Sequence, residues 1–518
     1  MRATSIGHAG LLIETDRGSI LCDPWFVPAF FGSWFVFPRN DQLSPELRSR
    51  IERPDYLYIS HLHADHLDDA FLAEHVDRAA TVLLPAFATD ELEQALRAHG
   101  FERFVHTADG EPVDLRGLEV TIHVETAIAD GPQGDSALVV SDGHTRLLNQ
   151  NDCRPHDLAL LTRRGPIDIQ WLQFSGAIWY PLVYDLPIER KREMARAKVE
   201  AQFARAIHYV RAIDARAVVP SAGPPCFLDP ELFGANMITG EEISIFPDQT
   251  EFLARLTSAG IDTAHLTIPG TAFTVTPDVI DVEQPMPMAD IERIFTHKAE
   301  YLQAYARDWA PWRRRHEASW HPARAGITGR IRAWWEPLLA SAPTLRAAIG
   351  ANALLRAGDE DILIDFPNGE VRTHAGEPYA FRFEIPRPLV ETVVDRRAVD
   401  WSNALFLSCR FRAWREGDYN EYLYNFFKSL SPARMARAEA EVVGRRAAGG
   451  TNVVVEEIEL GGYVMQRWCP HRRADLTQFG RIADGVLTCD LHGWQFDLAT
   501  GRCLNAADEH LQVRPATS

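Results

Sequence analysis

The most informative stretch for the fold is YISHLHADHLD, residues 58–68. The apolar run YLYIS, residues 56–60, predicts a short buried strand that leads into it. Three histidines and one aspartate then follow within six residues. Side chains spaced in this way on a loop at a strand end can converge on one or two metal ions. The pattern therefore predicts a metal centre, in preference to a solvated polar turn.

The HxHxDH pattern of this stretch resembles the metallo-β-lactamase superfamily, an αββα sandwich with a dinuclear metal site. The resemblance implies that His61 and His63 serve the first metal, and that Asp65 and His66 serve the second. It also implies a bridging carboxylate after a later strand, and Asp152 fits that place. We therefore expect these five residues to form the catalytic metal site.

The sequence is less clear about which residues provide the other two ligands of the superfamily. The usual third histidine should follow the strand LEVTIHVE, where His123 and Glu125 both stand, and we expect only one of them to be a ligand. We favour Glu125, because a carboxylate suits iron better than zinc. Asp135 is a further candidate. The last histidine should fall in the turn that begins at Ser221, where the sequence has none, so ordinary zinc hydrolysis is in doubt and a coordination position is left open.

A second cluster lies near the C-terminus, where Cys469-Pro-His471 precedes Cys489-Asp-Leu-His492. Two thiolates can hold one iron and two imidazoles the other, giving a [2Fe–2S] centre with a raised reduction potential. A zinc ribbon is the alternative, but the ligand order and the following WQFDLATGRC, residues 494–503, favour the iron–sulfur hairpin. Residues 452–515 resemble the Rieske domain family, whose four ligands match these four residues.

The fold class expected is α/β: a metallo-β-lactamase αββα sandwich, then a mixed α+β region, then a small all-β Rieske [2Fe–2S] domain. Proline-rich and glycine-rich breaks place the domain boundaries. We expect the sandwich over residues 1–285, a helical and mixed region over 286–430, a linker over 431–451 and the Rieske domain over 452–518. The pattern of the mixed region resembles sterol-carrier-like folds.

The two centres together indicate redox chemistry, because a dinuclear hydrolase needs no electrons and a Rieske domain needs an acceptor. The chain resembles the CMP-N-acetylneuraminate hydroxylase family, which pairs the same two domains and inserts oxygen into a C–H bond. The likeness covers most of residues 1–430, as in LCDPWFVPAF, FSGAIWYPLVY and DWSNALFLSCRF. The Rieske unit is C-terminal here and N-terminal in the animal enzymes. The layout also resembles the non-haem diiron monooxygenase of platensimycin and platencin biosynthesis, a natural product pathway.

These resemblances imply a diiron monooxygenase that hydroxylates an unactivated C–H bond of a small molecule with O2. The Rieske cluster would relay electrons from an external donor: a ferredoxin, a cytochrome or a reductase. The aromatic run WFVPAFFGSWFVF, residues 25–37, is either an apolar substrate wall or a buried segment; a wall would favour a diterpenoid or its CoA thioester. A zinc-dependent hydrolase or lactonase with an accessory Rieske domain is the main alternative. A flavodiiron-like oxidase and a mononuclear Rieske oxygenase fit less well.

Composition excludes some partners. The 518 residues carry a formal charge of -19, which disfavours nucleic acid. The sequence has no long apolar run and its N-terminus does not have the form of a signal peptide, so we expect no membrane span and a cytoplasmic location. Seven cysteines, an odd number, favour thiols over a disulfide framework. Homo-oligomerisation stays open, because a cluster and a catalytic site must approach within tunnelling reach.

Overall fold

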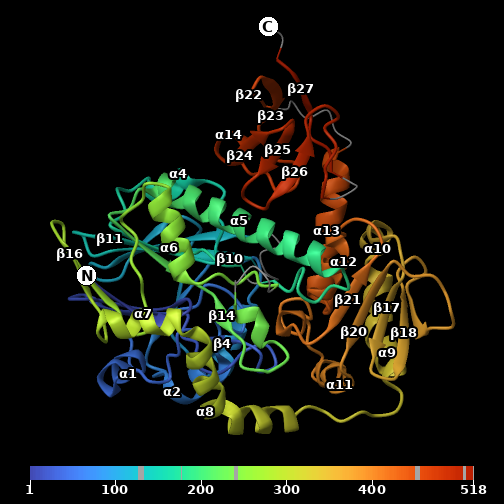
Figure 1. Ribbon diagram of the computed structural model, residues 1–518, viewed down its shortest axis with the longest axis horizontal. Coiled ribbons are helices and arrows are strands. Elements are labelled where there is room, and N and C mark those ends of the chain that lie inside the picture. Colours follow the sequence, from blue (N-terminus) through green and yellow to red (C-terminus); the bar gives the residue numbers. More distant parts are fainter. Residues whose placement is uncertain (127–133, 177, 238–242, 450–455, 506–508, 517–518) are drawn as a thin grey trace. The chain divides into compact units, whose positions relative to one another are not determined.

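The computed structural model describes residues 1–126, 134–176, 178–237, 243–449, 456–505 and 509–516 (Figure 1). The chain forms two compact units. The first contains Met1–Leu182, Pro187–Ser319 and Leu407–Cys409, and the second contains Val183–Leu186, Trp320–Phe406 and Arg410–Ser518.

Two sheets form the first unit. The eight-stranded sheet contains, in spatial order, β16 (Ile280–Glu283), β15 (Ala272–Val275), β1 (Arg2–Gly7), β2 (Gly10–Thr15), β3 (Gly18–Cys22), β5 (Tyr56–Tyr58), β6 (Thr81–Leu84) and β7 (Phe104–His106). The six-stranded sheet contains β13 (Ala217–Ser221), β12 (Ile169–Gln173), β11 (Arg146–Asn151), β10 (Asp135–Ser141), β9 (Glu119–Glu125) and β8 (Pro112–Asp114).

The two sheets pack face to face over one apolar core. Alternate residues of a strand point to opposite faces, so Leu11 and Ile13 of β2 enter this core while Leu12 points to the outer face. Three helices cover that outer face: α1 (Pro45–Ile51), α2 (Asp69–His75) and α3 (Glu91–Ala98). On the second sheet, α5 (Ile188–Ile213) and α6 (Gln249–Ser258) pack on β12 and β13, and α4 (Leu158–Thr162) packs on α5. The predicted αββα sandwich is confirmed.

The aromatic run that follows β3 is mostly core. Trp34 and Phe35 are fully buried, and Phe35 packs against α7 (Met288–Thr296) and α8 (Lys298–Ala318) through Ile291, Leu302 and neighbouring aromatic rings. These contacts explain why α7 and α8 belong to the first unit, although the sequence places a boundary near residue 285. For Trp34 and Phe35 the structure agrees with the buried-segment interpretation of the run.

The second unit begins with a five-stranded sheet. Its strands, in spatial order, are β19 (Glu370–Thr373), β18 (Glu360–Asp365), β17 (Ala353–Ala357), β20 (Phe381–Ile385) and β21 (Arg412–Arg415). Its helices are α9 (Ile327–Ser341), α10 (Pro343–Ile349), α11 (Arg387–Asp395), α12 (Glu421–Phe427) and α13 (Pro432–Gly449). Trp335 of α9 packs edge-on against Trp401 with ring centroids 4.9 Å apart, and it also contacts Phe427 of α12. Aromatic packing therefore joins helices and loops from both ends of this domain.

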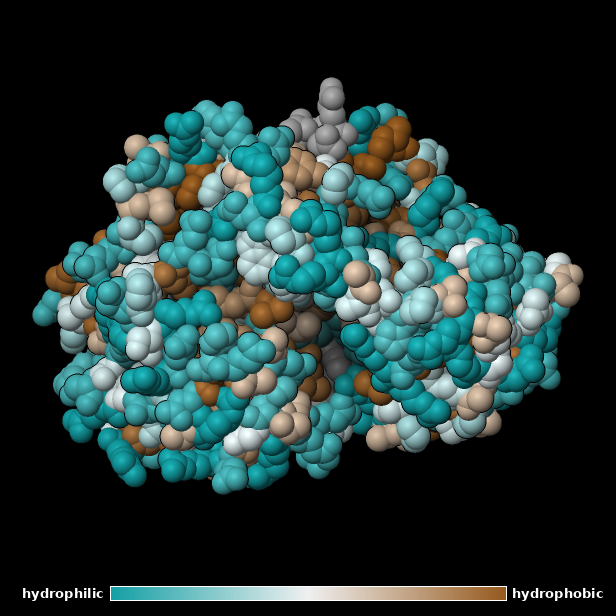
Figure 2. Space-filling model, turned by 90° about the horizontal axis from the view of Figure 1, so that it is seen from below, coloured by the Kyte–Doolittle hydropathy of each residue, from teal (hydrophilic) through white to brown (hydrophobic). Residues whose placement is uncertain are grey.

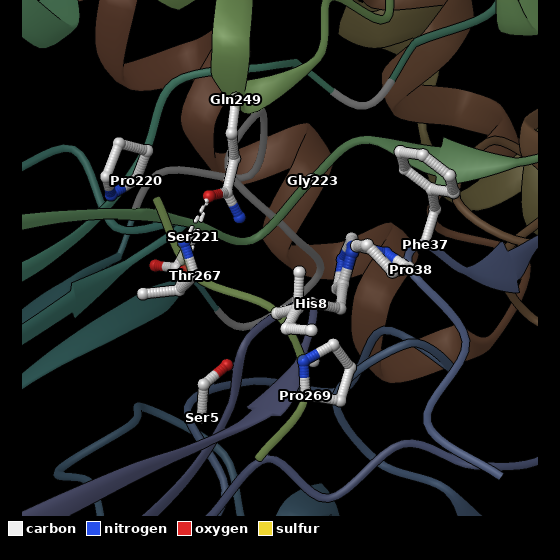
Figure 3. Close-up of a pocket in the computed structure, with 12 residues that line it drawn as sticks. Ser5, His8, Phe37, Pro38, Pro220, Ser221, Gly223, Gln249, Thr267 and Pro269 are labelled. Atoms are coloured by element: carbon white, nitrogen blue, oxygen red, sulfur yellow. Dashed lines mark hydrogen bonds between the residues drawn. The ribbon is translucent and has the colours of Figure 1, made fainter. Parts of the chain in front are cut away.

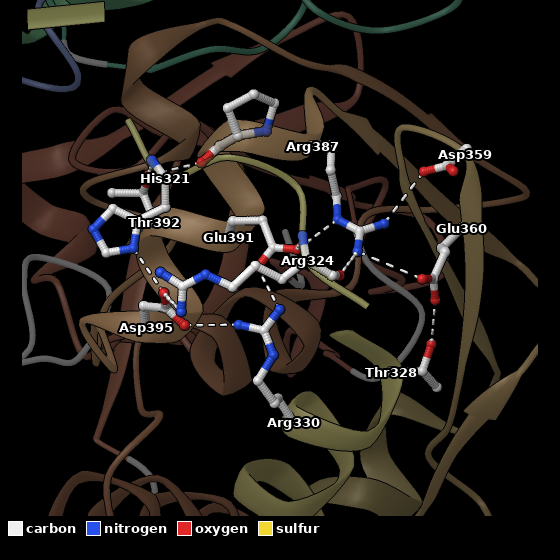
Figure 4. A network of polar contacts seen from close by, with 11 residues as sticks. His321, Arg324, Thr328, Arg330, Asp359, Glu360, Arg387, Glu391, Thr392 and Asp395 are labelled. Carbon is white, nitrogen blue, oxygen red and sulfur yellow. Dashed lines mark hydrogen bonds and ion pairs between the residues drawn. The ribbon is translucent and has the colours of Figure 1, made fainter. Parts of the chain in front are cut away.

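A charged network stabilises the same domain (Figure 4). Glu391 of α11 is fully buried and accepts hydrogen bonds from the Arg387 side chain at 2.8 Å, from the Arg324 backbone at 3.0 Å and from the Arg330 side chain. Because both carboxylate oxygens have partners, the buried charge is compensated.

The C-terminal part of the second unit has two three-stranded sheets. One contains β22 (Glu457–Leu460), β23 (Tyr463–Gln466) and β27 (Val513–Pro515); the other contains β24 (Gly480–Ala483), β25 (Val486–Cys489) and β26 (Trp494–Asp497). The one-turn helix α14 (Leu476–Phe479) separates β23 from β24. This arrangement confirms the small all-β domain.

The face shown in Figure 2 is mainly hydrophilic, with hydrophobic residues scattered over it. The described helices include none that is both long and apolar enough to cross a membrane.

Candidate metal centres

The predicted ligands of the first unit lie where several strands end. β5 ends at Tyr58, just before His61, and β11 ends at Asn151, just before Asp152. β1 runs in the direction of β5, because β1 and β3 are both antiparallel to β2 and β3 is parallel to β5. The turn after β1, which carries His8, therefore lies at the same edge of the sheet as the HxHxDH loop.

The ligand atoms converge in two groups that share one histidine. The groups are His8, Asp65 and His66, and His61, His66 and Asp152. In each group, one candidate ligand atom from every residue lies within 4.8 Å of the others. His63 joins the second group through its Nδ1, which is 2.7 Å from Nε2 of His61. The structure thus brings together the five ligands expected from the superfamily and adds His8.

Among the five ligands expected from the superfamily, four buried atoms have no hydrogen-bond partner within the described part of the chain: His63 Nε2, Asp65 Oδ1, His66 Nε2 and Asp152 Oδ1. Each buried unsatisfied polar group costs about 1–3 kcal/mol, so four in one place need an explanation. Metal ions bound there would satisfy them. Imidazole nitrogens with carboxylate oxygens suit zinc, iron or manganese. The residues therefore fit the metal pair that the superfamily implies.

Two carboxylates contact the Nδ1 atoms of two of the histidines. Asp23 Oδ2 lies 3.1 Å from Nδ1 of His66, and Asp135 Oδ1 lies 3.2 Å from Nδ1 of His61. Ser60 Oγ is also 2.9 Å from Nδ1 of His61. A carboxylate on one ring nitrogen fixes the tautomer and directs the other nitrogen, here Nε2, toward a metal. Asp135, a candidate ligand from the sequence, thus lies on the side of His61 away from His63.

The charges of the cluster are mutually stabilising. Burial alone would lower the pKa of His66, but the carboxylates of Asp65 and Asp152 raise it well above its usual value. Burial would raise the pKa of Asp65, but His66 and a hydrogen bond from His8 lower it. Burial lowers the pKa of His63 well below its usual value, which keeps its ring neutral and able to bind a metal.

Glu125 lies outside both groups. Its carboxylate accepts a hydrogen bond from the backbone nitrogen of His156 at 3.0 Å and pairs with Nδ1 of His156 at 2.8 Å. His123 lines a separate small cavity with Arg163. Residues 127–133, which follow Glu125 closely, lie outside the described residues. Glu125 as a metal ligand stays a prediction.

Sequence reasoning missed three buried polar residues around this cluster. Neither His8 nor Asp23 is among the ligands expected from the sequence patterns. Asp68 caps α2 through the backbone nitrogen of Phe71 at 3.0 Å, and it accepts hydrogen bonds from two backbone nitrogens of the loop after β3 at 2.8 Å. A polar residue directly after an apolar strand, as Asp23 is after β3, was the available signal.

The four predicted ligands of the second unit lie on two turns, one after β23 and one between β25 and β26. Cys469 and Cys489 are buried, and their thiols contact each other closely enough to share a hydrogen bond. The ring of His471 lies edge-on to that of His492, with centroids 5.1 Å apart, and stacks on Trp494 at 3.9 Å. The two thiols therefore lie together, and so do the two imidazoles.

These residues fit a [2Fe–2S] cluster. Nδ1 of His471 is buried and has no hydrogen-bond partner among the described residues. Backbone N–H groups of Arg472 and Leu491 point at the sulfurs of Cys469 and Cys489 respectively. Such N–H groups stabilise thiolate ligands and tune the potential of a cluster. The donor set thus has a free imidazole nitrogen and supported sulfurs where iron would bind.

The other nitrogen of His471 contacts the sterol-carrier-like part of the same unit. Its Nε2 lies 3.2 Å from Oε2 of Glu421, at the start of α12. Arg472 and Arg445 also donate to Glu421, at 2.6 and 3.2 Å. Burial alone would raise the pKa of Glu421, but His471 and the two arginines hold it well below its usual value. The charged carboxylate of Glu421 therefore contacts His471, one of the predicted cluster ligands, at the ring nitrogen Nε2.

Comparison with known protein families gives three matches along the chain. Residues 19–220 match a beta-lactamase superfamily domain, residues 327–443 an Rv3818-like, SCP2-like domain, and residues 428–514 a Rieske [2Fe-2S] domain. The SCP2-like match agrees with the sterol-carrier-like pattern expected for the mixed region. The Rieske match assigns an iron–sulfur cluster to the C-terminal domain.

Three similar proteins illustrate the relationships. The crystal structure of CmlA, a diiron beta-hydroxylase from Streptomyces venezuelae, is 18% identical and covers 53% of this chain and 54% of its own, with a TM-score of 0.35. Cytidine monophosphate-N-acetylneuraminic acid hydroxylase of Sus scrofa is 33% identical over 78 residues, which are 14% of this chain and 17% of that protein.

The third is the "Putative Rieske 2Fe-2S iron-sulfur protein Rv3818" of Mycobacterium tuberculosis (strain ATCC 25618 / H37Rv). It is 44% identical over 522 residues, 99% of both chains. The chain therefore belongs to the family of this Rieske 2Fe-2S iron-sulfur protein, with a beta-lactamase superfamily domain and a Rieske domain in one polypeptide.

Proposed function

We propose that the chain is a non-haem diiron monooxygenase that hydroxylates an unactivated C–H bond of a small molecule, using O2 and electrons relayed through its Rieske cluster. One observation carries the proposal: a cluster of imidazoles and carboxylates with four unsatisfied buried atoms occurs in the same chain as a Rieske domain. A one-electron carrier serves an oxygenase, whereas metal-assisted hydrolysis needs no electrons.

The donor set supports iron in the first unit. Two carboxylates, Asp65 and Asp152, lie among the three histidines of the HxHxDH loop, and Asp23 and Asp135 back two of the rings. Imidazole mixed with hard oxygen ligands is the set that non-haem iron oxygenases use. When bound, an iron pair would supply the activation of O2.

The protein's own contribution is to orient the ligands and exclude water. Asp23 and His66 are fully buried, and Asp65 is 2% exposed, so bulk solvent does not reach this side of the cluster. Trp25, also fully buried, stands edge-on to His8 with ring centroids 4.8 Å apart. An apolar wall of this kind limits the escape of reactive species and strengthens electrostatic interactions inside the site.

The substrate stays a small molecule of undefined class. The aromatic run of residues 25–37 raised the expectation of a diterpenoid or its CoA thioester, but the burial of Trp34 and Phe35 in the core removes the support that these two residues gave it. The hydroxylation of a C–H bond, which needs electrons and O2, does not depend on that choice.

Metal content and oxygen labelling test the proposal. Protein purified without oxygen should contain about four irons per chain, two in the cluster and two in the first unit, together with the EPR signal of a reduced Rieske centre. With a turned-over substrate, 18O2 should label the product. About two zincs per chain in the first unit, with hydrolytic turnover in the absence of a reductant, would instead support the zinc hydrolase alternative. The match to a beta-lactamase superfamily domain is the observation that favours this alternative.

A further inference from the structure

The first unit has a histidine where the superfamily ligand is missing. The last superfamily histidine should follow a late strand, but β13 ends at Ser221 and the turn continues with Ala222 and Gly223. In the structure this turn lies against the end of β1: the backbone nitrogen of Ala222 donates to the carbonyl oxygen of His8 at 2.9 Å. Figure 3 shows His8 with Ser221 and Gly223 in the wall of one small cavity. The volume of this cavity is about 10 Å³.

The side chain of His8 is aimed at the metal cluster. Its Nε2 lies 3.0 Å from Oδ2 of Asp65, and the ligand atoms of His8, Asp65 and His66 lie within 4.8 Å of one another. Two ligand atoms on one metal, each 2.0–2.2 Å from it, lie at most about 4.4 Å apart. In tetrahedral geometry they lie about 3.4 Å apart, so a contraction of about 1 Å or less would let all three residues bind a single ion.

The surroundings of His8 also indicate a constrained ligand. The residue is buried, 8% exposed, and its backbone has a φ of 52°, a left-handed conformation that a histidine seldom adopts. Such strain persists only where the surrounding structure imposes it, and it is concentrated at functional sites. Here the bend points the ring from the end of β1 toward Asp65 and His66.

We propose that His8 is a protein ligand of the second metal, together with Asp65 and His66, and that it replaces the histidine missing from the turn after β13. The inference rests on the dimetal site of the proposed function, but not on the identity of the metal. The alternative is that His8 only donates a hydrogen bond to Asp65 and so positions that carboxylate.

Metal counting in the full-length protein separates these roles. Acid-labile sulfide gives the number of Rieske clusters, and total metal minus the cluster iron gives the metal in the first unit. The wild type should hold about two such metals per chain, and His8→Ala should hold about one. His123→Ala is the matched control, because His123 is equally buried, 8% exposed, but lies in a separate cavity; it should keep about two.

A second variant distinguishes a ligand from a positioning residue. In His8→Gln the side-chain amide can still donate a hydrogen bond to Asp65, but it is a poor metal ligand. We expect His8→Gln to lose the same metal as His8→Ala while unfolding near the wild-type temperature. Two metals retained in His8→Gln would overturn the proposal, and so would two retained in His8→Ala.

Cobalt gives a readout independent of activity. The metals of the first unit are removed from the full-length chain while the Rieske cluster stays intact, and Co2+ is then added. The wild type should take up two Co2+ ions and His8→Gln should take up one. The visible absorption of Co2+ should therefore be weaker in His8→Gln than in the wild type. If the native metal is zinc, the proposed oxygenase fails, but the count of two against one still supports His8. If iron and 18O incorporation are found while the count is equal, the His8 assignment alone fails.

Discussion

The two metal-binding regions differ in how the chain gathers their ligands. The Rieske ligands come from two short turns, residues 469–471 and 489–492, within one small domain. The cluster of the first unit draws residues from the ends of strands in two different sheets, as the pairing of Asp23 at the end of β3 with Asn151 at the end of β11 shows. A local hairpin is enough for the first kind of site, whereas the second exists only in the folded sandwich.

The regions also differ in their polar balance. In the dimetal cluster, four buried atoms of the superfamily ligands have no hydrogen-bond partner among the described residues. In the charged network around Glu391, both carboxylate oxygens accept hydrogen bonds. Buried polar groups are normally satisfied, so the contrast separates a site prepared for a ligand from a network that stabilises the fold.

The largest expected effect comes from removing one centre at a time. Asp152→Asn should lose the metals of the first unit and at least about 10³-fold of hydroxylation, about 4 kcal/mol, yet keep the cluster sulfide and the Rieske EPR signal. Cys469→Ser should lose the cluster and keep the metals of the first unit. Metal and sulfide analysis of both variants checks the pair. Loss of both centres in either variant would contradict their independence.

Breaking the saturated network should cost stability and leave both centres loaded. Glu391→Ala leaves the guanidinium groups of Arg387 and Arg330 without their buried partner, so the free energy of unfolding should fall by about 3 kcal/mol or more. Asp359→Asn is the control, because Asp359 also pairs with Arg387, at 3.3 Å, but is 88% exposed; its effect should stay below about 1 kcal/mol. Denaturant unfolding of the holo protein measures both. Equal effects would show that burial does not matter here.

Asp23 should govern metal affinity more than stability. Its carboxylate fixes His66 with Nε2 toward the metal, so Asp23→Asn should weaken metal binding in the first unit about 10–100-fold. Asp68→Asn is a control from the HxHxDH loop, because Asp68 is 4% exposed and binds backbone nitrogens instead of a cluster histidine. It should lower the unfolding temperature with the metal affinity nearly unchanged. Competition with a chelator measures the affinities, and an unchanged value for Asp23→Asn would refute the positioning role.

Local patterns predicted the parts of the molecule that depend on neighbours in sequence. The apolar run YLYIS forms β5, and the run LEVTIHVE forms β9. The Rieske ligands and the HxHxDH loop are likewise contiguous. In each case the residues that carry the signal are also the residues that interact.

Contacts distant in sequence were out of reach. His8 meets Asp65 across 57 positions, and Glu421 meets His471 across 50, so no spacing rule could join them. The aromatic run gave two equal interpretations because burial depends on α7 and α8, which follow about 250 positions later. Sequence also cannot tell which ring nitrogen of His61 Asp135 faces.

Glu421 gives the smallest but most specific effect. Its carboxylate pairs with Nε2 of His471 and, being charged, should favour the oxidised cluster. Glu421→Gln keeps a hydrogen-bond acceptor but removes the negative charge, so the reduction potential should rise, by roughly 60 mV for a tenfold change in the one-electron equilibrium. Voltammetry of the full-length protein measures the shift, and the cluster sulfide content should not change.

Glu441→Gln is the matched control for this charge. Glu441 also accepts a hydrogen bond from Arg445, at 2.7 Å, whereas the carboxylate that contacts His471 is that of Glu421, so the substitution of Glu441 alters the same arginine and leaves the Glu421–His471 contact in place. In Glu441→Gln, the shift in the reduction potential of the cluster should be only a small fraction of the shift in Glu421→Gln. If both variants shift equally, the arginines and not the bond to His471 set the potential. If neither shifts, the buried carboxylate serves packing alone, and the Rieske site resembles the Glu391 network more than the dimetal cluster.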